Sequence, residues 1–434
     1  MLKRADAVSP PSRTSVSPRA ALAIAVALAI VLAINITPWL PLQDFNEWGY
    51  EGFIGAQLLQ HHLSAQFAFV SYPVPNALIQ VALCALDLVL APSTSTRVIA
   101  NLYAALAFAA AWALARRFQA ARPAPCFLVL LFGIYFNASF WSGYLNFQFG
   151  LLVFSAWLLC EPRTRSRPIV VLAFSLLAFF THAIVWAAIL LMMGIEAFKD
   201  RKPLPRLPAL VSVGLFGWYL AAKAPPQGFS SVEHPSLLWT LTYKLYTVAK
   251  FGPYHNFVFS DAPHEGIARL FHLGGSALNV LCALGLIGVI YWALREAWRR
   301  ADYTTVATVG ALLLTFLALP PIVADVLNPG ERTLGLALLL CIVRTPAAKL
   351  IDMLSVGAVV LVFCLIGLML TPPPVWEQHV SVGLPPGGFV ENLFWSRPSA
   401  FVLQARAADA GEARWPLTFH TSLLTERTST ARAD

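Results

Sequence analysis

Three carboxylates, Asp44, Glu47 and Glu51, follow the first long apolar stretch of this 434-residue chain. Their spacing of i, i+3 and i+7 would place all three side chains on one face of a helix. Acidic side chains at a membrane boundary are costly unless they are paired or functional. We therefore expect chemistry in this cluster, since a carboxylate within hydrogen-bond reach of a proton can act as a general base. The same three oxygen ligands could instead hold Mg²⁺ or Mn²⁺, and a solvated helix face is a further interpretation.

The composition of the chain is that of a membrane protein. Hydrophobic residues make up 58% of the chain and charged residues 12%, and the mean hydropathy is +0.67. This leaves too little polar surface to cover a soluble globule. Apolar runs of about 17–22 residues recur, the length that a hydrocarbon core of about 30 Å requires. We predict an all-α polytopic membrane protein in which residues 1–19 are cytoplasmic and 20–40 are a retained anchor.

Basic residues gather in six short clusters between the apolar runs, at 3–19, 116–122, 163–167, 199–206, 295–300 and 344–349. Short cytoplasmic loops retain such charge, so the clusters mark the inner side of the membrane. They do not form the continuous basic face that nucleic-acid binding requires. Between clusters on the same side the chain must cross the membrane an even number of times. This counting predicts eleven spans, with the N-terminus inside and the C-terminus outside.

The same counting places residues 74–92 at the outer interface, because a third crossing before Arg116 would put that cluster outside. An acidic outer loop then extends over 42–96. Residues 123–162 and 168–198 become two hairpins of short spans, with outer turns at 142–146 and 181–182. Halves of about 15 residues extend only about 22 Å, which is less than the hydrocarbon thickness. We therefore expect a recess that opens to the outside and is lined by protein or water.

The rest of the chain divides at residues 222 and 371. Further spans are predicted at 207–222, 273–294, 303–323, 333–344 and 350–371. In the outer loop that follows residue 222, leucines recur at helical spacing over 237–248 and predict an interfacial helix. The domains are thus a module at 20–222, an outer loop with four further spans at 223–371, and an outer tail or small cap at 372–434. The six cysteines lie in apolar runs without a C-x-x-C pair, so we expect neither disulfides nor a zinc site.

Several motifs follow one another in the first half of the chain. They are the acidic loop Asp44-x-x-Glu47-x-x-Tyr50 after one span, a segment that opens with Tyr72-Pro73-Val-Pro75, and Arg97 leading into a span that ends in Arg116-Arg117. In this order, and with short-span hairpins after them, residues 1–222 resemble the GT-C superfamily of integral-membrane glycosyltransferases. The resemblance implies transfer of a hexosyl or pentosyl group from a polyprenyl-phosphate donor to an acceptor glycan, lipid or protein. It also implies an outer-loop carboxylate as base, for which Asp44 is the first candidate and Glu47 the second. The implied location is the bacterial cytoplasmic (inner) membrane in the cell envelope.

A lipid-phosphate donor needs cationic and hydrogen-bonding partners. The candidates are Arg332, Lys250, Arg97, His182, Asn146 and Tyr72. Arg332 leads them because a guanidinium fork binds phosphate in a bidentate manner. For the basic residues beside spans the alternative is contact with lipid headgroups. For His182 the alternative is a hydrogen-bonded core histidine, and for Asn146 it is turn formation.

Two other functions compete with glycosyl transfer. One is a transporter or flippase for a lipid-linked or small polar substrate, and the other is an O-antigen-type polymerase or ligase. Ion-coupled transporters need ionisable residues within their spans, which are scarce here. The polymerase or ligase class lacks an acid after the first span. The acidic loop therefore favours the transferase.

Overall fold

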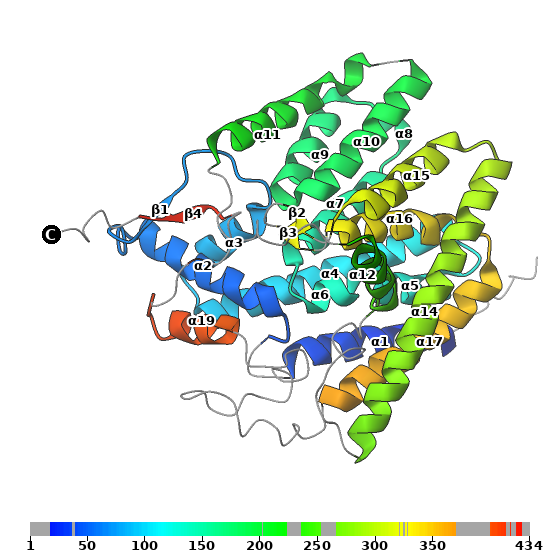
Figure 1. Ribbon diagram of the computed structural model, residues 1–434, viewed down its shortest axis with the longest axis horizontal. Helices are drawn as coiled ribbons and strands as arrows, with labels where there is room; N and C mark the ends of the chain where they lie inside the picture. The colour runs from blue at the N-terminus through cyan, green and yellow to red at the C-terminus, as the bar shows by residue number, and fades with distance from the viewer. Residues whose placement is uncertain are drawn as a thin grey trace, which may run out of the picture.

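The computed structural model describes residues 18–36, 40–201, 203–223, 236–252, 266–320, 322–323, 326–327, 329–369, 400–413, 417 and 422–427. The predicted cytoplasmic segment 1–19 lies outside these residues except for its last two. The predicted tail 372–434 is described only in its second half. The described chain is almost entirely helical, and its longer helices lie side by side in one bundle (Figure 1). This confirms the all-α class.

Helices lie at all eleven positions where spans were predicted. They are α1 (Pro18–Asn35), α4 (Pro92–Phe118), α5 (Pro123–Leu130) with the π-helical turn η1 (Leu131–Tyr135), α7 (Leu145–Leu159), α9 (Pro168–Thr181), α10 (Ala183–Asp200), α11 (Leu210–Ala222), α14 (Gly266–Arg299), α15 (Tyr303–Ala318), α16 (Pro329–Arg344) and α17 (Ala348–Met369). Among the described residues, five helical stretches are long and apolar enough to cross a membrane, at Pro18–Asn35, Pro92–Phe118, Leu204–Ala222, Gly266–Arg299 and Ala348–Gly367. The chain is thus an integral membrane protein, while the eleven-span topology stays a prediction.

Shorter elements connect these helices. They are α2 (Gln43–Leu59), α3 (Leu78–Leu86), α6 (Ala138–Trp141), α8 (Pro162–Arg165), the 3-10 helix η2 (Leu204–Ala209), α12 (Leu237–Ala249) and α19 (Ala400–Asp409), with the strands β1 (Phe67–Phe69), β2 (Ile322–Val323), β3 (Val326–Leu327) and β4 (Leu424–Glu426). Strands β2 and β3 pair with each other in an antiparallel hairpin. Proline begins α4, α5, α8 and α9, because its fixed φ suits the first helical position and its missing N–H is not needed there.

The predicted break at 181–182 is confirmed even though no glycine or proline marks it. Helix α9 ends at Thr181, and His182 has an extended conformation (φ −164°, ψ 126°) before α10 begins. Asn76 holds the break from outside the hairpin. The side-chain oxygen of Asn76 accepts a hydrogen bond from the Ala183 backbone N–H at 2.9 Å. The backbone N–H of Asn76 donates to the Phe179 carbonyl at 3.3 Å. The segment that opens with Tyr72 therefore shapes the second hairpin.

Residues 74–92 contain one short helix. Helix α3 has nine residues, about 13 Å of helix, which cannot cross a bilayer. It packs closely on α2, because a Cβ on Gly52 would lie 2.7 Å from Leu83 and one on Gly55 would lie 2.2 Å from the Cys84 sulfur. The glycines of the acidic helix thus allow α2 and α3 to approach each other.

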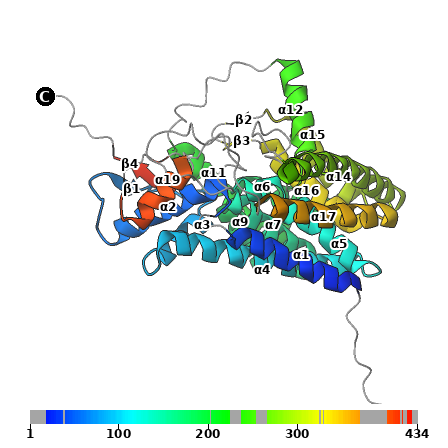
Figure 2. The same cartoon turned by 90° about the horizontal axis from the view of Figure 1, so that it is seen from below.

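The described part of the C-terminal tail covers α2. Helix α19 packs on α2, and β4 pairs with β1 in an antiparallel register that joins Phe67 to Glu426 and Phe69 to Leu424. Both views show α2, α19, β1 and β4 together at one end of the bundle (Figures 1 and 2). Following the predicted topology, we call this the outer end, and we call the opposite end, with α8 and the end of α16, the inner end. The tail is therefore a cap on the first outer loop in the residues described.

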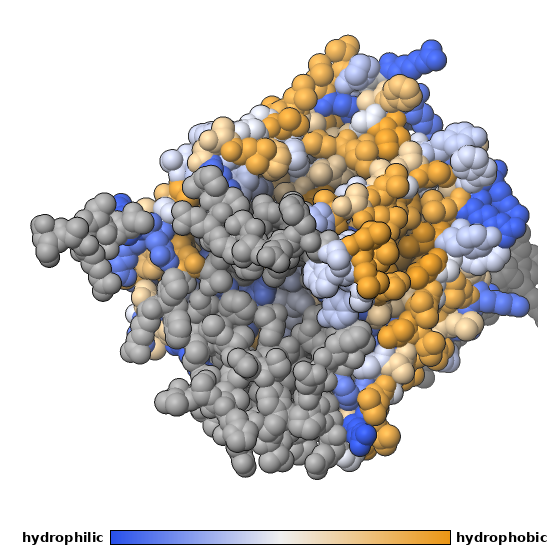
Figure 3. Space-filling model, in the orientation of Figure 1, coloured by the Kyte–Doolittle hydropathy of each residue, from blue (hydrophilic) through white to orange (hydrophobic). Residues whose placement is uncertain are grey.

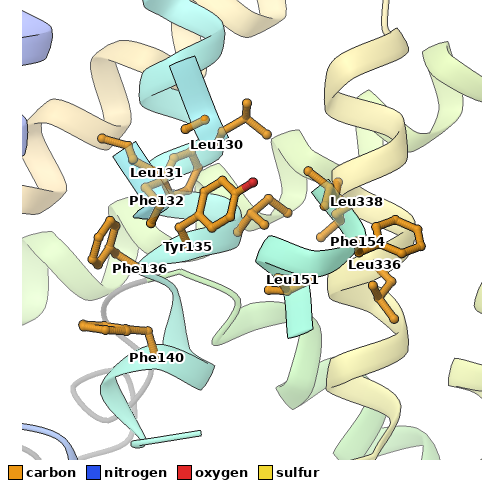
Figure 4. Close-up of a cluster of buried hydrophobic side chains, with 14 of the residues drawn as sticks. Leu130, Leu131, Phe132, Tyr135, Phe136, Phe140, Leu151, Phe154, Leu336 and Leu338 are labelled. Atoms are coloured by element: carbon orange, nitrogen blue, oxygen red, sulfur yellow. The ribbon is translucent and has the colours of Figure 1, made fainter. Parts of the chain in front are cut away.

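The centre of the bundle is aromatic and aliphatic. Figure 4 shows the side chains of η1, α6, α7 and α16 that meet there, among them Phe132, Phe136, Phe140, Phe154 and Leu338. The outside is apolar too, since leucines of α12, α14 and α15 are exposed, as Figure 3 shows for one face. A helical bundle with both a dry core and an apolar outer surface suits a lipid environment.

Candidate functional site

The start of α2 is held against the turn of the first hairpin. The Asp44 N–H donates to the Ser142 carbonyl at 3.1 Å. Gly143 has φ +87°, and a Cβ there would lie 2.5 Å from the Phe45 nitrogen. Only glycine fits both the positive φ and this close approach. The predicted helix and the predicted turn are thus confirmed, and together they place Asp44 beside residues 142–144.

Asp44 has the electrostatic character of a base that titrates near neutrality. Its side chain is half-buried, and burial raises the pKa of the carboxyl group to about 7, although the positive charge of Arg332 acts in the opposite direction. A general base is most effective when its pKa lies near the working pH. Asp44 therefore has the protonation behaviour that a base for transfer at neutral pH needs.

Arg332 comes from the first turn of α16, almost three hundred residues after Asp44. It is 6% exposed, and its guanidinium lies over the Tyr144 ring at 4.3 Å from the centroid. Its charge acts on Asp44, Tyr144 and His182. Arg332 is consequently the residue around which the first outer loop and both hairpins meet.

A buried ion pair lies next to Arg332. Lys250 Nζ is 2.8 Å from Glu331 Oε2, and the two side chains are 5% and 2% exposed. The Ser139 hydroxyl donates to the other Glu331 oxygen at 2.6 Å. Two buried charges need such partners, because removing either would leave the other uncompensated. The predicted cation Lys250 therefore belongs to this site, with its charge balanced by Glu331.

His182 and Asn146 are buried in the two hairpins. His182 Nδ1 accepts the Ile184 N–H at 3.2 Å, and the ring lies edge-on to Phe147 at 5.2 Å. With Nδ1 as an acceptor, the neutral ring carries its proton on Nε2. Asn146 Oδ1 is buried and accepts no hydrogen bond from the described residues. Since an unsatisfied buried acceptor costs about 1–3 kcal/mol, this oxygen is available to a ligand donor.

Glu51, the third member of the acidic trio, has hydrogen-bond partners on α3 and in the tail. Glu51 Oε2 accepts hydrogen bonds from Gln80 Nε2 at 2.5 Å and from the Ser422 hydroxyl at 2.7 Å. Glu47 is fully buried in α2. Among the described residues, no three His, Cys, Asp or Glu side chains are placed to hold a metal ion. Glu51 thus joins α2 to α3 and to the tail, rather than completing a site with Asp44 and Glu47.

Arg97 and Tyr72 lie elsewhere in the structure. Arg97 is on α4, where its guanidinium donates to the Asn35 carbonyl at 3.5 Å and lines a small cavity with Asn46. Tyr72 packs against Tyr219 of α11 at 6.0 Å between ring centroids. The contacts described for these two predicted ligands are thus with α1, through Asn35, and with α11, through Tyr219.

Three residues of the site were missed from the sequence: Tyr144, Ser139 and Glu331. Glu331 had one usable signal, since an acid in the first turn of a helix interacts favourably with the helix dipole and directly precedes Arg332. Tyr144 and Ser139 flank the predicted turn at 142–146 but carry no pattern that marks them. We use the name Asp44 site for Asp44, Ser139, Tyr144, Asn146, His182, Lys250, Glu331 and Arg332.

Comparisons with known proteins gave no match to this chain. No protein-family model matches the chain, no curated protein is significantly similar to it in sequence, and no solved structure is significantly similar to it in fold. The resemblance of residues 1–222 to the GT-C superfamily rests on the motifs around Asp44, Tyr72 and Arg97 alone.

Proposed function

We propose that this chain is a membrane glycosyltransferase of GT-C type that uses a polyprenyl-phosphate-linked hexose or pentose. The observation that carries the proposal is the meeting of Asp44 and Arg332. A half-buried carboxyl with a pKa of about 7 lies within the field of a buried guanidinium. Transfer to a hydroxyl or amine needs both a base and a cation for the leaving phosphate. A transporter needs no such pair at the edge of its spans.

The reaction assigns one role to each partner. The acceptor oxygen or nitrogen attacks the anomeric carbon with its electron pair, and Asp44 takes the acceptor proton. The bond between the anomeric carbon and the phosphate oxygen breaks, and polyprenyl phosphate leaves with that electron pair. Arg332 stabilises the charge on the leaving phosphate through its guanidinium fork. The sugar is inverted because attack and departure occur on opposite sides of the anomeric carbon.

Other residues of the Asp44 site position these two. The Lys250–Glu331 pair fixes the start of α16, and the Tyr144 ring holds the guanidinium of Arg332 from one side. Asn146 Oδ1 would accept from a sugar hydroxyl, and the His182 ring would donate from Nε2. Glu47 is a weaker candidate for the base because its side chain is fully buried.

The proposal includes the predicted topology. Eleven spans with the N-terminus inside and the C-terminus outside place α2 and α19 on the extracytoplasmic side of a bacterial inner membrane. The polyprenyl tail of the donor would then stay in the bilayer while its sugar meets Asp44. Lipid contact suits the exposed leucines of the bundle.

The test is transfer by purified protein from a panel of polyprenyl-phosphate sugars. Asp44→Asn should lower the rate about 100- to 10,000-fold, the contribution of a positioned base. Asp87→Asn is the matched control, because burial also raises the pKa of Asp87 to about 7 but this residue lies at the end of α3. It should leave the rate close to that of the wild type, because Asp87 lies outside the Asp44 site and the amide keeps the size of the carboxyl group. Full transfer activity in Asp44→Asn would contradict the proposal. So would a wild-type protein that transfers no sugar while Asp44→Asn loses export of a solute, and this second result would favour the transporter.

A further inference from the structure

A second polar cavity lies at the inner end of the bundle, away from the Asp44 site. It has a volume of about 240 Å³ and lies between α8, α10, α15 and α16. Three arginines line it, Arg165, Arg206 and Arg344, together with Glu196 and Asp302. We call this cavity the arginine pocket. It shares no residue with the Asp44 site, and Figure 1 shows α8 far from α2 and α19, on the other side of the bundle.

Two carboxylates of the pocket, Glu196 and Asp302, are already paired with donors. Glu196 accepts from Arg165 through Oε1 at 2.7 Å and from Arg206 through Oε2 at 3.0 Å. Asp302 accepts from Arg344 at 3.0 Å and from the Thr305 hydroxyl and N–H at 2.5 and 3.2 Å. A metal cation binds through several carboxylate oxygens that remain available to it. The ion pairs therefore argue against a cation in this pocket.

The arginines, in contrast, keep unused donors. Each guanidinium has five N–H donors, yet Arg344 makes one hydrogen bond among the described residues, to Asp302. Arg165 Nε is buried and finds no acceptor among the described residues. The positive charges of Arg165 and Arg344 also act on each other. An anion between them would accept the spare donors and relieve this repulsion.

The remaining lining residues add little net charge to the pocket. Thr304 is in the first turn of α15, a 16-residue helix whose N-terminus carries partial positive charge. Lys199 and Asp200 at the end of α10 are exposed and of opposite sign, so they leave the balance of the pocket unchanged. A volume of 240 Å³ has room for about eight waters at roughly 30 Å³ each, or for one phosphoryl group with part of its hydration shell.

We propose that the arginine pocket binds a phosphate-type oxyanion at the inner face of the membrane. Forked guanidinium groups recognise phosphate through paired charge-assisted hydrogen bonds. Arg165 and Arg344, the two arginines with unused donors, both line this cavity. The phosphoryl group comes either from a soluble phosphorylated molecule or from the headgroup of an anionic lipid. Anion binding by this pocket does not depend on glycosyl transfer, whereas its assignment to the inner face follows the predicted topology.

Two arms of one experiment separate the sources. Full-length protein in nanodiscs of phosphatidylcholine is titrated with inorganic phosphate and with pyrophosphate, and binding is read from calorimetry and from the melting temperature. In the second arm, native mass spectrometry counts phosphatidic acid against phosphatidylcholine bound to the detergent-purified protein. A soluble anion that binds and displaces phosphatidic acid identifies a soluble ligand. Binding of phosphatidic acid alone identifies a lipid headgroup.

The variants test the pocket itself. Arg165→Gln should weaken the bound anion by about tenfold or more, the loss expected for one charge-assisted hydrogen bond. Glu196 keeps Arg206 as a partner in this variant, so the fold should persist. Arg344→Lys keeps the charge, removes the fork and should weaken binding as well, which covers the case of an unfolded Arg165→Gln. Arg299→Gln is the control, because Arg299 is an exposed basic residue of the inner end outside the pocket.

Two results would overturn the proposal. One is wild-type protein that binds neither phosphate, pyrophosphate nor phosphatidic acid. The other is a loss of affinity in Arg299→Gln as large as that in Arg165→Gln. Such a loss would show that the anion is attracted to the basic face in general and does not bind in the arginine pocket.

Discussion

The Asp44 site and the inner end of the bundle hold their ion pairs in different surroundings. The side chains of Lys250 and Glu331 are 5% and 2% exposed, whereas those of Arg344 and Asp302 are 30% and 39% exposed. Buried charges depend on each other, because neither can return to water when its partner is removed. Partly exposed charges are screened by water and lose little. Single charge changes should therefore be costly at the Lys250–Glu331 pair and tolerated at the Arg344–Asp302 pair.

The largest effect is expected at Glu331. Glu331→Gln keeps the size of the side chain but removes the negative charge that balances the buried Lys250 ammonium, which also lies 5.3 Å from the centroid of the Tyr246 ring. Breaking a buried pair costs about 3–5 kcal/mol, so the free energy of unfolding in detergent should fall by that amount. Equilibrium unfolding of the purified variant measures it.

A double variant sharpens this prediction. Glu331→Leu with Lys250→Met replaces both charges by apolar groups and should recover most of the lost free energy of unfolding. If Glu331→Gln alone unfolds like the wild type, the pair is solvated in solution and the contrast between the two regions fails.

A smaller effect is expected from pH on transfer. Since the pKa of Asp44 is raised to about 7, the base is ionised above that pH and protonated below it. The rate should therefore fall as pH decreases, by about 100-fold between pH 8 and pH 5, with the dependence of a single ionised base. Asp87→Asn should keep this profile, because Asp87 titrates in the same range but takes no proton from the acceptor. A rate that is flat between pH 8 and pH 5 would contradict Asp44 as the base.

The contribution of Asp44 to stability should depend on pH in the sense opposite to its contribution to the transfer rate. The folded state holds the Asp44 proton up to about pH 7, whereas the unfolded chain releases it near its ordinary pKa of 3.8. The contribution of Asp44 to folding is thus fully present below 3.8 and is lost as pH rises through 7. Melting curves of Asp44→Asn against the wild type over this pH range show whether that contribution disappears with the carboxyl group.

The smallest effect is expected at the inner end. Glu296 and Arg300 form an ion pair one helical turn apart in α14 and beyond its end, with side chains 23% and 72% exposed. Glu296→Gln should lower the free energy of unfolding by about 0.5 kcal/mol or less, because water screens such pairs. A loss of several kcal/mol, seen in the same unfolding assay as for Glu331, would remove the difference between the two ends.

Local patterns predicted much of the fold. The apolar runs gave the positions of eleven helices, the i, i+3, i+7 acids lie on α2, and the leucines of 237–248 lie on α12. The break at 181–182 was predicted from charge counting alone and proved to be fixed by Asn76. These features depend on neighbours within a few turns or on the side of the membrane, and both can be inferred from sequence.

The Asp44 site joins residues that are far apart in the sequence, and it was predicted only in part. Asp44, Arg332, Lys250 and His182 were expected and lie together, although their roles in transfer stay predictions. The partner of Lys250 could not be inferred, because Glu331 is 81 residues away in sequence and on another helix. Arg97 was expected at the site because it has the right charge and side of the membrane, yet those two properties do not fix which face of α4 it occupies.

The hydrogen bond between Ser422 and Glu51 sets an order of events during synthesis of the protein. The two residues are separated by 371 positions, so at about 5–20 residues per second roughly 20 to 70 seconds pass between their translation. During that time α2 lacks both its partner hydroxyl and the strand that pairs with β1. The acidic loop reaches its final form only after residue 422 has been synthesised, and a chain that stops before this residue keeps the membrane helices among the described residues but not a completed first loop.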